Sequence, residues 1–293
     1  MEMSQLQAFI SVAHNRSFSI TANQLHLTQP AISKRISTLE EHLGCALFDR
    51  IGHRIQLTTA GSILLPIAIK ILQDVEDYKR QVQGLNNSVS GKLTLASSHH
   101  ISLHRLPEIL KTFARQYKDV ELDFQFLESE QACEAVRVGK IELAVITLPL
   151  ETDEKLLTDN LWNDPLVCMS SNEHSLCTIS DITLAKLVEY PILLPEKQTF
   201  TRQIIERPFI ENNLKLNTLM TTNDLESLRM MVEIGLGWSI LPESMLRDPL
   251  VAIKVEGLEL KRTLGLVINK NRTLSSSAKA MIKLLKSTID LPL

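Results

Sequence analysis

The chain has 293 residues, 44% of them apolar, and its 31 Lys and Arg stand against 34 Asp and Glu, which gives a net charge of -3. This length predicts two or three domains with cores of useful size, and the 10 Gly and 11 Pro are too few for a collagen-like or low-complexity chain. The net charge excludes a protein that is strongly basic over its whole surface. Taken alone, it does not indicate a nucleic-acid-binding protein.

We expect no membrane span and no signal peptide. The longest apolar run, 63–69, is interrupted by Pro66, whereas a spanning helix needs about 20 apolar residues. The first residues lack a cationic start followed by an apolar stretch. The cysteines form no C-x-x-C pair and no zinc-finger spacing, and they are Cys45, Cys133, Cys168 and Cys177. Such cysteines indicate a cytoplasmic protein with inert thiols, with a redox-sensing cysteine as the alternative.

Residues 1–58 are predicted to form short helices. The first helix has one apolar face, at Leu6, Phe9, Ile10 and Ala13. Ser19 is the predicted N-cap of a second helix that reaches about His26. Thr28 caps a third helix, which has Pro30 in its first turn and ends at Gly44. The second and third helices are joined by a turn of two or three residues, which indicates a helix-turn-helix.

Residues 47–57 predict two short strands around a turn at Gly52, which would make a small basic wing. A long helix begins after Thr58. Its apolar residues step by three or four positions, at Leu64, Ile67, Ile71, Val75, Tyr78, Val82 and Leu85. This spacing is typical of a coiled-coil seam, so we expect a dimerising arm. The alternative is packing of this helix against its own domain.

The segment 84–91, rich in Gly, Asn and Ser, is the predicted linker. Beyond it strands alternate with helices. The predicted strands are 92–97, 121–127, 143–147, 166–170, 192–194, 219–222, 238–241 and 264–268. The predicted helices are 106–117, 132–138, 184–190, 201–212, 224–234 and 275–287. This alternation predicts a mostly parallel sheet with helices on both faces, divided into two lobes with a ligand between them.

The exposed side of the third predicted helix can read DNA from the major groove. Gln29 can pair with adenine through two hydrogen bonds, and Ser33 and Lys34 can reach bases or phosphates. The candidate DNA-binding residues are Thr28, Gln29, Pro30, Ser33, Lys34, Arg35, Thr38, Arg50, His53 and Arg54. Composition alone favours a merely solvated face, since residues 1–58 hold five Lys and Arg against four Asp and Glu. The order of the motifs reverses that preference.

The N-terminal motifs resemble those of the LysR-type bacterial transcriptional regulators. The resemblance is carried by LQAFISVA at 6–13, LHLTQPAIS at 25–33, LFDR at 47–50 and LTTAG at 57–61, in register and without gaps over about 60 residues. The run GLGWSILP at 235–242 also looks like a family feature. One departure is Arg16, where the family often has Gly, and it affects only a turn.

The resemblance implies an N-terminal all-α winged helix-turn-helix with a long linker helix, followed by an α/β two-lobed effector domain that is similar to periplasmic solute-binding proteins. The implied parts are the reader at 1–58, the dimerising helix at 59–88, a hinge at 89–91, lobe 1 at 92–162 and 264–293, and lobe 2 at 163–263. It further implies promoter DNA as partner and a dimer of dimers. RNA polymerase is a candidate partner.

The cleft of such a protein lies outside the carboxyl ends of its strands, where helix N-termini favour anions. We expect a carboxylate effector and no cofactor. The candidate effector-binding residues are Ser97, Ser98, His99, His100, Thr147, Thr199, Arg202 and Asn223. N-capping alone is the alternative for the Ser and Thr residues, and an outward surface position is the alternative for Arg202.

His99, His100 and His104 suggest a metal site, because His100 and His104 are spaced to share one helix face. Zinc takes three or four ligands, and no Glu or Cys accompanies this group in sequence. We therefore predict no metal. An enzyme is also not expected, because G-x-S-x-G, P-loop and G-x-G-x-x-G motifs are absent. A binding protein whose N-terminal helices only dimerise remains the rival hypothesis.

Overall fold

The computed structural model describes residues 1–51, 54–84, 89–151 and 153–288, without the side chains of residues 50, 51, 54, 73, 76, 77 and 79–84. The chain divides into two compact units, an N-terminal unit (1–86) and a C-terminal unit (87–293). In the part that is described, no helix is long and apolar enough to span a membrane.

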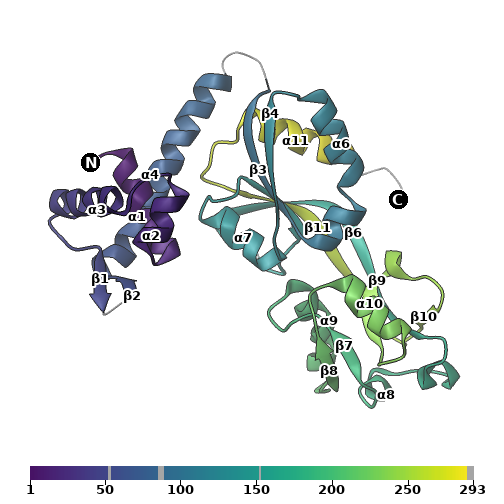
Figure 1. Ribbon diagram of the computed structural model, residues 1–293. Coiled ribbons are helices and arrows are strands. Elements are labelled where there is room, and N and C mark those ends of the chain that lie inside the picture. Colours follow the sequence, from purple (N-terminus) through teal and green to yellow (C-terminus); the bar gives the residue numbers. More distant parts are fainter. Residues whose placement is uncertain (52–53, 85–88, 152, 289–293) are drawn as a thin grey trace. The chain divides into compact units, whose positions relative to one another are not determined.

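The N-terminal unit begins with α1 (Met3–Asn15), α2 (Phe18–Gln24) and α3 (Gln29–Leu43) (Figure 1). The N-cap of α2 is Ser17, whose hydroxyl accepts a hydrogen bond from the Ile20 amide at 3.2 Å. The prediction of Ser19 as this cap is wrong, because the backbone of Ser17 is extended and the helix has already begun at Phe18. Thr28 caps α3 through the Ala31 amide, as predicted, and the left-handed Gly44 ends it.

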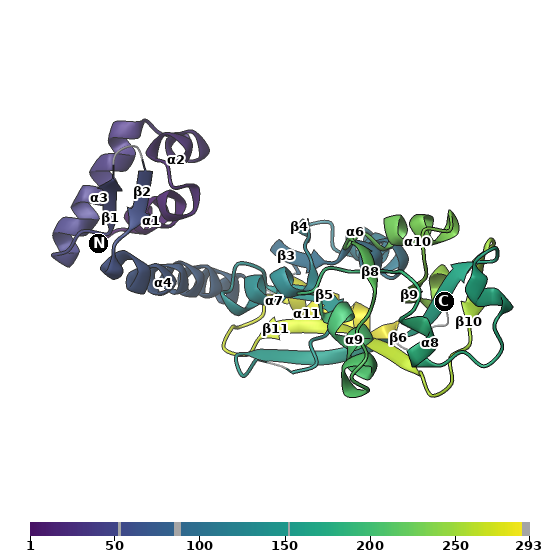
Figure 2. The ribbon, with the colours of Figure 1, turned by 90° about the horizontal axis from the view of Figure 1, so that it is seen from below.

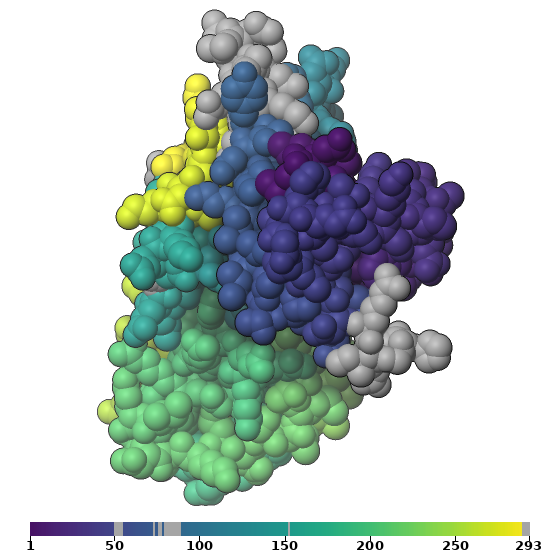
Figure 3. Space-filling view, turned by 90° about the vertical axis from the view of Figure 1, so that its left-hand side faces the viewer, coloured from purple at the N-terminus to yellow at the C-terminus, as the bar shows by residue number. Residues whose placement is uncertain are grey.

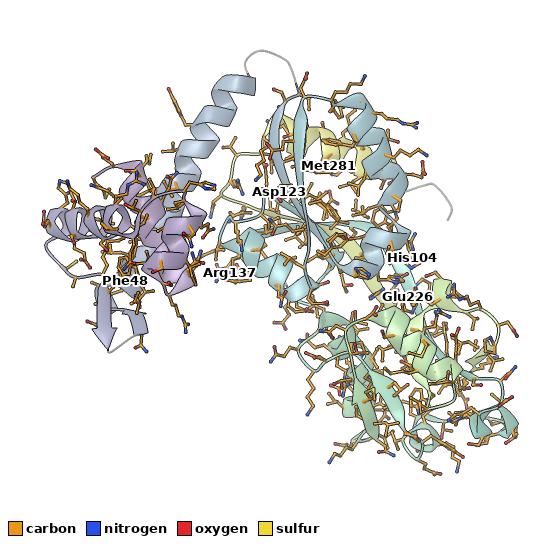
Figure 4. The ribbon with its side chains drawn as sticks, viewed as in Figure 1. Phe48, His104, Asp123, Arg137, Glu226 and Met281 are labelled. Atoms are coloured by element: carbon orange, nitrogen blue, oxygen red, sulfur yellow. The ribbon has the colours of Figure 1, made fainter. Side chains whose placement is uncertain are left out.

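The three helices enclose one apolar core. Phe48 is half-buried and packs against this core, where its ring meets Phe9 and Phe18 edge-on at centroid distances of 5.5 and 6.1 Å (Figure 4). The core also contains Leu6, Val12, Ile32, Ile36, Leu39 and Leu47. Burial of this stripe leaves the opposite side of α3 free to face solvent.

The wing consists of β1 (Phe48–Ile51) and β2 (Arg54–Leu57), which pair antiparallel. Helix α4 (Thr59–Gly84) follows at once. Its first turn lies so close to the wing that a Cβ on Gly61 would stand 2.2 Å from the Leu47 carbonyl oxygen. Only glycine fits this approach, which explains Gly61 in the first turn of the helix.

The predicted seam of α4 has two different environments. Leu64 and Ile71 pack against the core of their own unit, as the alternative interpretation has it. Ile67 and Tyr78 are exposed. Leu85 and the side chain of Val82 lie outside the described residues. Among the described side chains of α4, the apolar surface left exposed is therefore narrower than the sequence suggests.

The C-terminal unit contains a seven-stranded sheet, in the order β10-β6-β11-β5-β3-β4 with β9 also paired to β6, as far as the chain is described. Its strands are β3 (Gly91–Ser97), β4 (Val120–Phe126), β5 (Leu143–Thr147), β6 (Leu156–Ser171), β9 (Ser239–Pro242), β10 (Leu250–Ile253) and β11 (Leu260–Asn269). A separate parallel pair is formed by β7 (Ile192–Leu194) and β8 (Thr218–Thr221).

The sheet is mixed, so the prediction of a mostly parallel sheet is wrong. Only β3 pairs parallel with its neighbours β4 and β5, while β6 and β11 run antiparallel to each other and to the strands beside them. The reason is that β6 and β11 carry the chain across and back, in opposite directions (Figure 2). Strand β6 is longer than predicted, and β10 was not predicted at all.

The first lobe is built on β3, β4, β5 and the adjoining ends of β6 and β11. Helices α6 (Pro107–Gln116) and α11 (Ser276–Ser287) cover one face of it, and α7 (Ser129–Arg137) covers the other. Alternate residues of the strands serve the two faces, as the period of a strand requires. Leu95 and Val145, for instance, belong to the core under α6, and Ala96 and Ile146 to the core under α7.

The second lobe is built on β7, β8, β9, β10 and the other ends of β6 and β11. Helices α8 (Leu184–Leu187) and α9 (Phe200–Glu211) share one core, centred on the buried Trp238. Helix α10 (Leu225–Glu233) covers a second core. The two lobes join where β6 and β11 pair, and Asp164 and Arg262 lie opposite each other in that register. The predicted residue boundaries of the lobes stay a prediction.

Candidate nucleic-acid interface and effector cleft

The exposed side of α3 carries the candidate DNA-reading residues. Thr28, Gln29, Pro30 and Lys34 are exposed, and Ser33, Arg35 and Thr38 are half-buried. The N-terminal unit forms the purple and indigo part of the surface in Figure 3. The α3 surface is polar and follows the N-terminal half of a helix, which is the part that contacts base edges in a helix-turn-helix.

One hydrogen bond orients the residue with the clearest capacity for base reading. The Ser19 hydroxyl of α2 donates to Gln29 Oε1 at 3.0 Å, and the Gln29 side chain is otherwise exposed. The Thr38 hydroxyl bonds within its own helix, since it donates to the Lys34 carbonyl at 2.9 Å. Of the predicted phosphate contacts in the wing, His53 and the side chains of Arg50 and Arg54 lie outside the described residues.

The C-terminal unit has a polar cavity between its lobes, with about 580 Å³ of free space including the part open to solvent. Six predicted cleft residues line it, namely Ser98, His99, His100, Thr147, Thr199 and Asn223. Thr147 is the last residue of β5, and the others follow β3, β7 and β8, at the strand ends where the sequence predicted them. Ser98 precedes the short helix α5 (His99–His104), which was not predicted separately, and its side chain makes no capping hydrogen bond.

Two other predicted cleft residues do not line the cavity. Ser97 is fully buried, and its hydroxyl donates to the Val145 carbonyl at 2.7 Å, so it joins two strands of the sheet. Arg202 is also buried, and it donates to Glu206, to the Pro195 carbonyl and to the Thr218 hydroxyl. Both side chains are therefore satisfied by the protein, and neither faces the cleft.

Arg262 lines the cleft and was missed by sequence reasoning. It is 4% exposed, and its Nε donates to Asp164 Oδ2 at 2.7 Å while Nη1 donates to the Thr201 hydroxyl at 3.1 Å. Its Nη2 is buried without a hydrogen-bond partner among the described residues. Arg105 also approaches Asp164, at 3.6 Å. Two arginines thus share one buried carboxylate, so this group of three side chains carries one net positive charge beside the cleft.

The walls of the cleft are acidic, with Glu128, Glu130, Asp224 and Glu226 among the lining residues. Burial raises the pKa of Glu128, and the charge of Glu130 adds to this effect. Glu130 crosses the cleft to accept a hydrogen bond from the Phe200 amide at the start of α9. Sequence reasoning missed Glu128 and Glu130. Glu128 follows strand β4 and Glu130 lies at the start of α7, and these positions could have indicated them.

The histidines of α5 have unequal environments. Burial, together with the nearby Arg262 charge, lowers the pKa of His100 to about 3, so its imidazole is neutral at pH 7. Its Nδ1 has no hydrogen-bond partner among the described residues. His104 lies one turn further, and its Nε2 stands 3.4 Å from Glu226 Oε1 of α10.

Two cysteines are in surroundings that suppress thiolate chemistry. Burial raises the pKa of Cys168 to about 12, and burial with the Glu130 charge does the same for Cys133. These thiols are the weakest candidates for the redox-sensing alternative, since the thiolate is the reactive form. Cys177 is exposed and Cys45 half-buried.

A helix-turn-helix unit with an exposed recognition helix, followed by a two-lobed unit with a polar cleft, defines the class of DNA-binding regulators that carry their own sensor domain. Residues 3–62 match the bacterial regulatory helix-turn-helix protein, lysR family, and residues 86–290 match the LysR substrate binding domain. The chain therefore belongs to the LysR family of transcriptional regulators, which bind DNA and are not enzymes.

Curated relatives support this membership. The uncharacterized HTH-type transcriptional regulator YwqM of Bacillus subtilis is 28% identical over 98% of this chain and 99% of its own. The transcriptional activator CmpR of Synechocystis is 29% identical over 95% of this chain and 92% of its own. An uncharacterized HTH-type regulator of Azotobacter vinelandii is 56% identical over 36% of this chain and 74% of its own.

Solved structures share the fold. A full-length OxyR variant from Pseudomonas aeruginosa has a TM-score of 0.70 at 21% identity, over 99% of this chain and 95% of that one. CbnR in complex with its target DNA has a TM-score of 0.66 at 19% identity, over 98% of this chain and all of that one.

Proposed function

We propose that this LysR-family regulator reads specific promoter sequences through α3 and that a small carboxylate-bearing metabolite in the cleft switches its activity. The observation that carries the proposal is Arg262 Nη2, a buried donor without a partner among the described residues, in a cavity that is also lined by several hydroxyls. A guanidinium whose Nη2 has no hydrogen-bond partner suits a carboxylate oxygen. The positive charge left by the pairing of Asp164 with two arginines favours the same ligand.

The acidic walls narrow the class of metabolite. A ligand with several negative groups would meet Glu128, Glu130 or Asp224, and unscreened like charges are costly at short distance. The proposed effector therefore has one carboxylate, directed to Arg262 and the Ser98 hydroxyl, and a neutral or cationic opposite end. Ser98, Thr147 and Thr199 are placed to bind its polar groups.

A thermal-shift panel of monocarboxylic, dicarboxylic and amino acids tests the ligand class. A ligand at 100 times its Kd stabilises the state it binds by about 2.7 kcal/mol, so a match is seen as a raised Tm. Ser98→Ala should weaken the effector while leaving DNA binding in its absence unchanged. Thr178→Ala, an exposed hydroxyl in the second lobe and not among the cavity residues, is the matched control. Preference for dicarboxylates over monocarboxylates would contradict the proposal.

Promoter recognition is tested with duplexes from the regulator's own upstream region. Affinity for a specific site should exceed affinity for a scrambled duplex and should fall steeply with salt, because phosphate contacts release counterions. Equal affinity for every duplex would favour the rival hypothesis, in which the N-terminal helices only dimerise.

The proposed assembly is a homodimer through α4, and two dimers would form the tetramer. Ile63, Ile67 and Tyr78 support this, as large apolar side chains that remain more than half or about half exposed on one helix. Ile67→Glu should shift the molar mass in solution toward smaller species, measured by light scattering. Ser62→Glu places the same charge on another side of α4 and should leave the mass unchanged. An unchanged molar mass for Ile67→Glu would contradict the proposed dimer through α4.

A further inference from the structure

Three possible metal ligands meet from opposite lobes, and two of them, His100 and Glu226, also line the cleft. His100 and His104 lie one turn apart on α5 of the first lobe, and Glu226 lies in the first turn of α10 of the second. One ligand atom from each lies within 4.8 Å of the other two. The sticks show the His104 and Glu226 side chains next to each other, where the two lobes meet (Figure 4).

The distances fit a small cation better than a direct contact. His104 Nε2 and Glu226 Oε1 are 3.4 Å apart, which is long for a charge-assisted hydrogen bond. Two ligands of one tetrahedral zinc ion, each bonded at about 2.0–2.1 Å, stand roughly 3.3 Å apart. The rings of His100 and His104 have centroids 4.6 Å apart, so both imidazoles belong to the same small volume.

Two further observations support a ligand at this place. His100 is mostly buried, and its Nδ1 has no protein partner among the described residues, although a buried imidazole nitrogen is costly to leave unpaired. Glu226 is held from behind, since Arg229 donates to its other oxygen, Oε2, at 3.0 Å. Outer hydrogen bonds of this kind orient the carboxylate ligand of a metal. Oε1 remains directed to the histidines.

We propose that His100, His104 and Glu226 bind a divalent transition metal ion, with Zn²⁺ as the best match, and that this ion clasps the two lobes. Two imidazoles and one carboxylate form a donor set that suits zinc. Mg²⁺ and Ca²⁺ prefer oxygen ligands and do not suit it. Three protein ligands leave a fourth position for water or for a carboxylate that enters the cleft.

The sequence pointed away from this site because Glu226 is remote from the histidines along the chain. The fold brings it to them only when α10 of the second lobe meets α5 of the first. The site therefore depends on the lobes being close together, and a bound ion would in turn hold them there. This inference is independent of which metabolite the cleft takes.

Titration of the full-length, chelator-treated protein with Zn²⁺ against a chromophoric chelator tests the proposal. We expect one tightly bound ion per chain, and no such binding in His104→Ala. His104 is 43% exposed in its side chain, so its loss leaves the fold intact, which circular dichroism checks. Glu226→Gln should weaken binding by at least about tenfold. His174→Ala, an imidazole elsewhere in the second lobe that accepts a hydrogen bond from the Leu176 amide, is the matched control.

Replacement of Zn²⁺ by Co²⁺ adds a spectroscopic readout. A tetrahedral site should give the visible absorption of four-coordinate Co²⁺ in the wild type and in His174→Ala, and not in His104→Ala. Mg²⁺ at the same concentration should not displace it. No stoichiometric binding by the wild type, or equal binding by His104→Ala, would overturn the proposal.

The metal and metabolite proposals can fail separately. Ser98→Ala should retain Zn²⁺ while losing the metabolite response. A protein that responds to a metabolite without binding Zn²⁺ would refute the clasp alone. A protein that binds Zn²⁺ but responds to no carboxylate would refute the proposed effector alone.

Discussion

The recognition surface of α3 and the effector cleft differ in how their polar side chains are arranged. The α3 side chains come from one continuous segment, and Thr28, Gln29 and Lys34 project into solvent. The cleft side chains come from segments far apart, and several of them, such as Arg262 and Glu130, are already bonded to other parts of the protein. Substitutions of exposed α3 side chains such as Gln29 and Lys34 should therefore change affinity with little change in stability. Substitutions of buried, hydrogen-bonded cleft side chains such as Arg262 should change both.

Asp164→Ala should have the largest effect of the changes considered. Asp164 is buried between Arg262 and Arg105, and the substitution leaves the buried Arg262 and the partly buried Arg105 without this carboxylate. Removing one partner of a buried ion pair costs about 3–5 kcal/mol. Denaturant unfolding of the C-terminal unit in the full chain measures the loss, with Lys34→Ala as the solvent-exposed control, expected within about 0.5 kcal/mol of the wild type. Equal unfolding free energies of Asp164→Ala and Lys34→Ala would contradict the expected difference between the buried cleft and the exposed side of α3.

Gln29→Ala should follow in size and should act on binding alone. If Gln29 reads adenine, the variant loses about 1–3 kcal/mol of discrimination between specific and scrambled duplexes. The unfolding free energy should stay unchanged, because Gln29 is exposed. Equal weakening on both duplexes would show that Gln29 contacts the backbone and not a base.

Ser17→Ala should have the smallest effect of the three. Its hydroxyl caps α2 through the Ile20 amide, and loss of such a cap costs about 1 kcal/mol. Ser19, the cap that local sequence suggests, lies inside α2 and bonds Gln29 instead. Ser19→Ala should therefore leave thermal stability nearly unchanged while altering Gln29. A larger loss of stability in Ser19→Ala than in Ser17→Ala would reverse this assignment.

The N-terminal unit was predictable because its information is local. Thr28 and Gly44 mark the ends of α3 by their own conformational preferences, and the structure places those ends there. The exception is α2, where both Ser17 and Ser19 satisfy the local rule for a cap. Only the packing of Phe18 into the core decides between them, and packing is not a local property.

The cleft was predictable only in part, for the same reason. The ends of strands β3, β5 and β7 were found, and with them Ser98, Thr147 and Thr199. Arg262 lies within β11 and not at a strand end, and its importance comes from the partner that the register places opposite it. Glu226 meets His104 only through the closeness of two lobes. Neither relation has a signature in spacing along the chain.

The pairing of β6 with β11 has a mechanical consequence. Arg262 and Asp164 belong to the two strands that join the lobes, and Arg262 also lines the cavity between those lobes. A ligand that bonds its free Nη2 therefore acts at the pivot itself, and not at the far end of either lobe. The displacement produced by a small rotation there increases with distance from the axis. A few atoms at the junction can therefore move whole helices at the outer ends of the lobes.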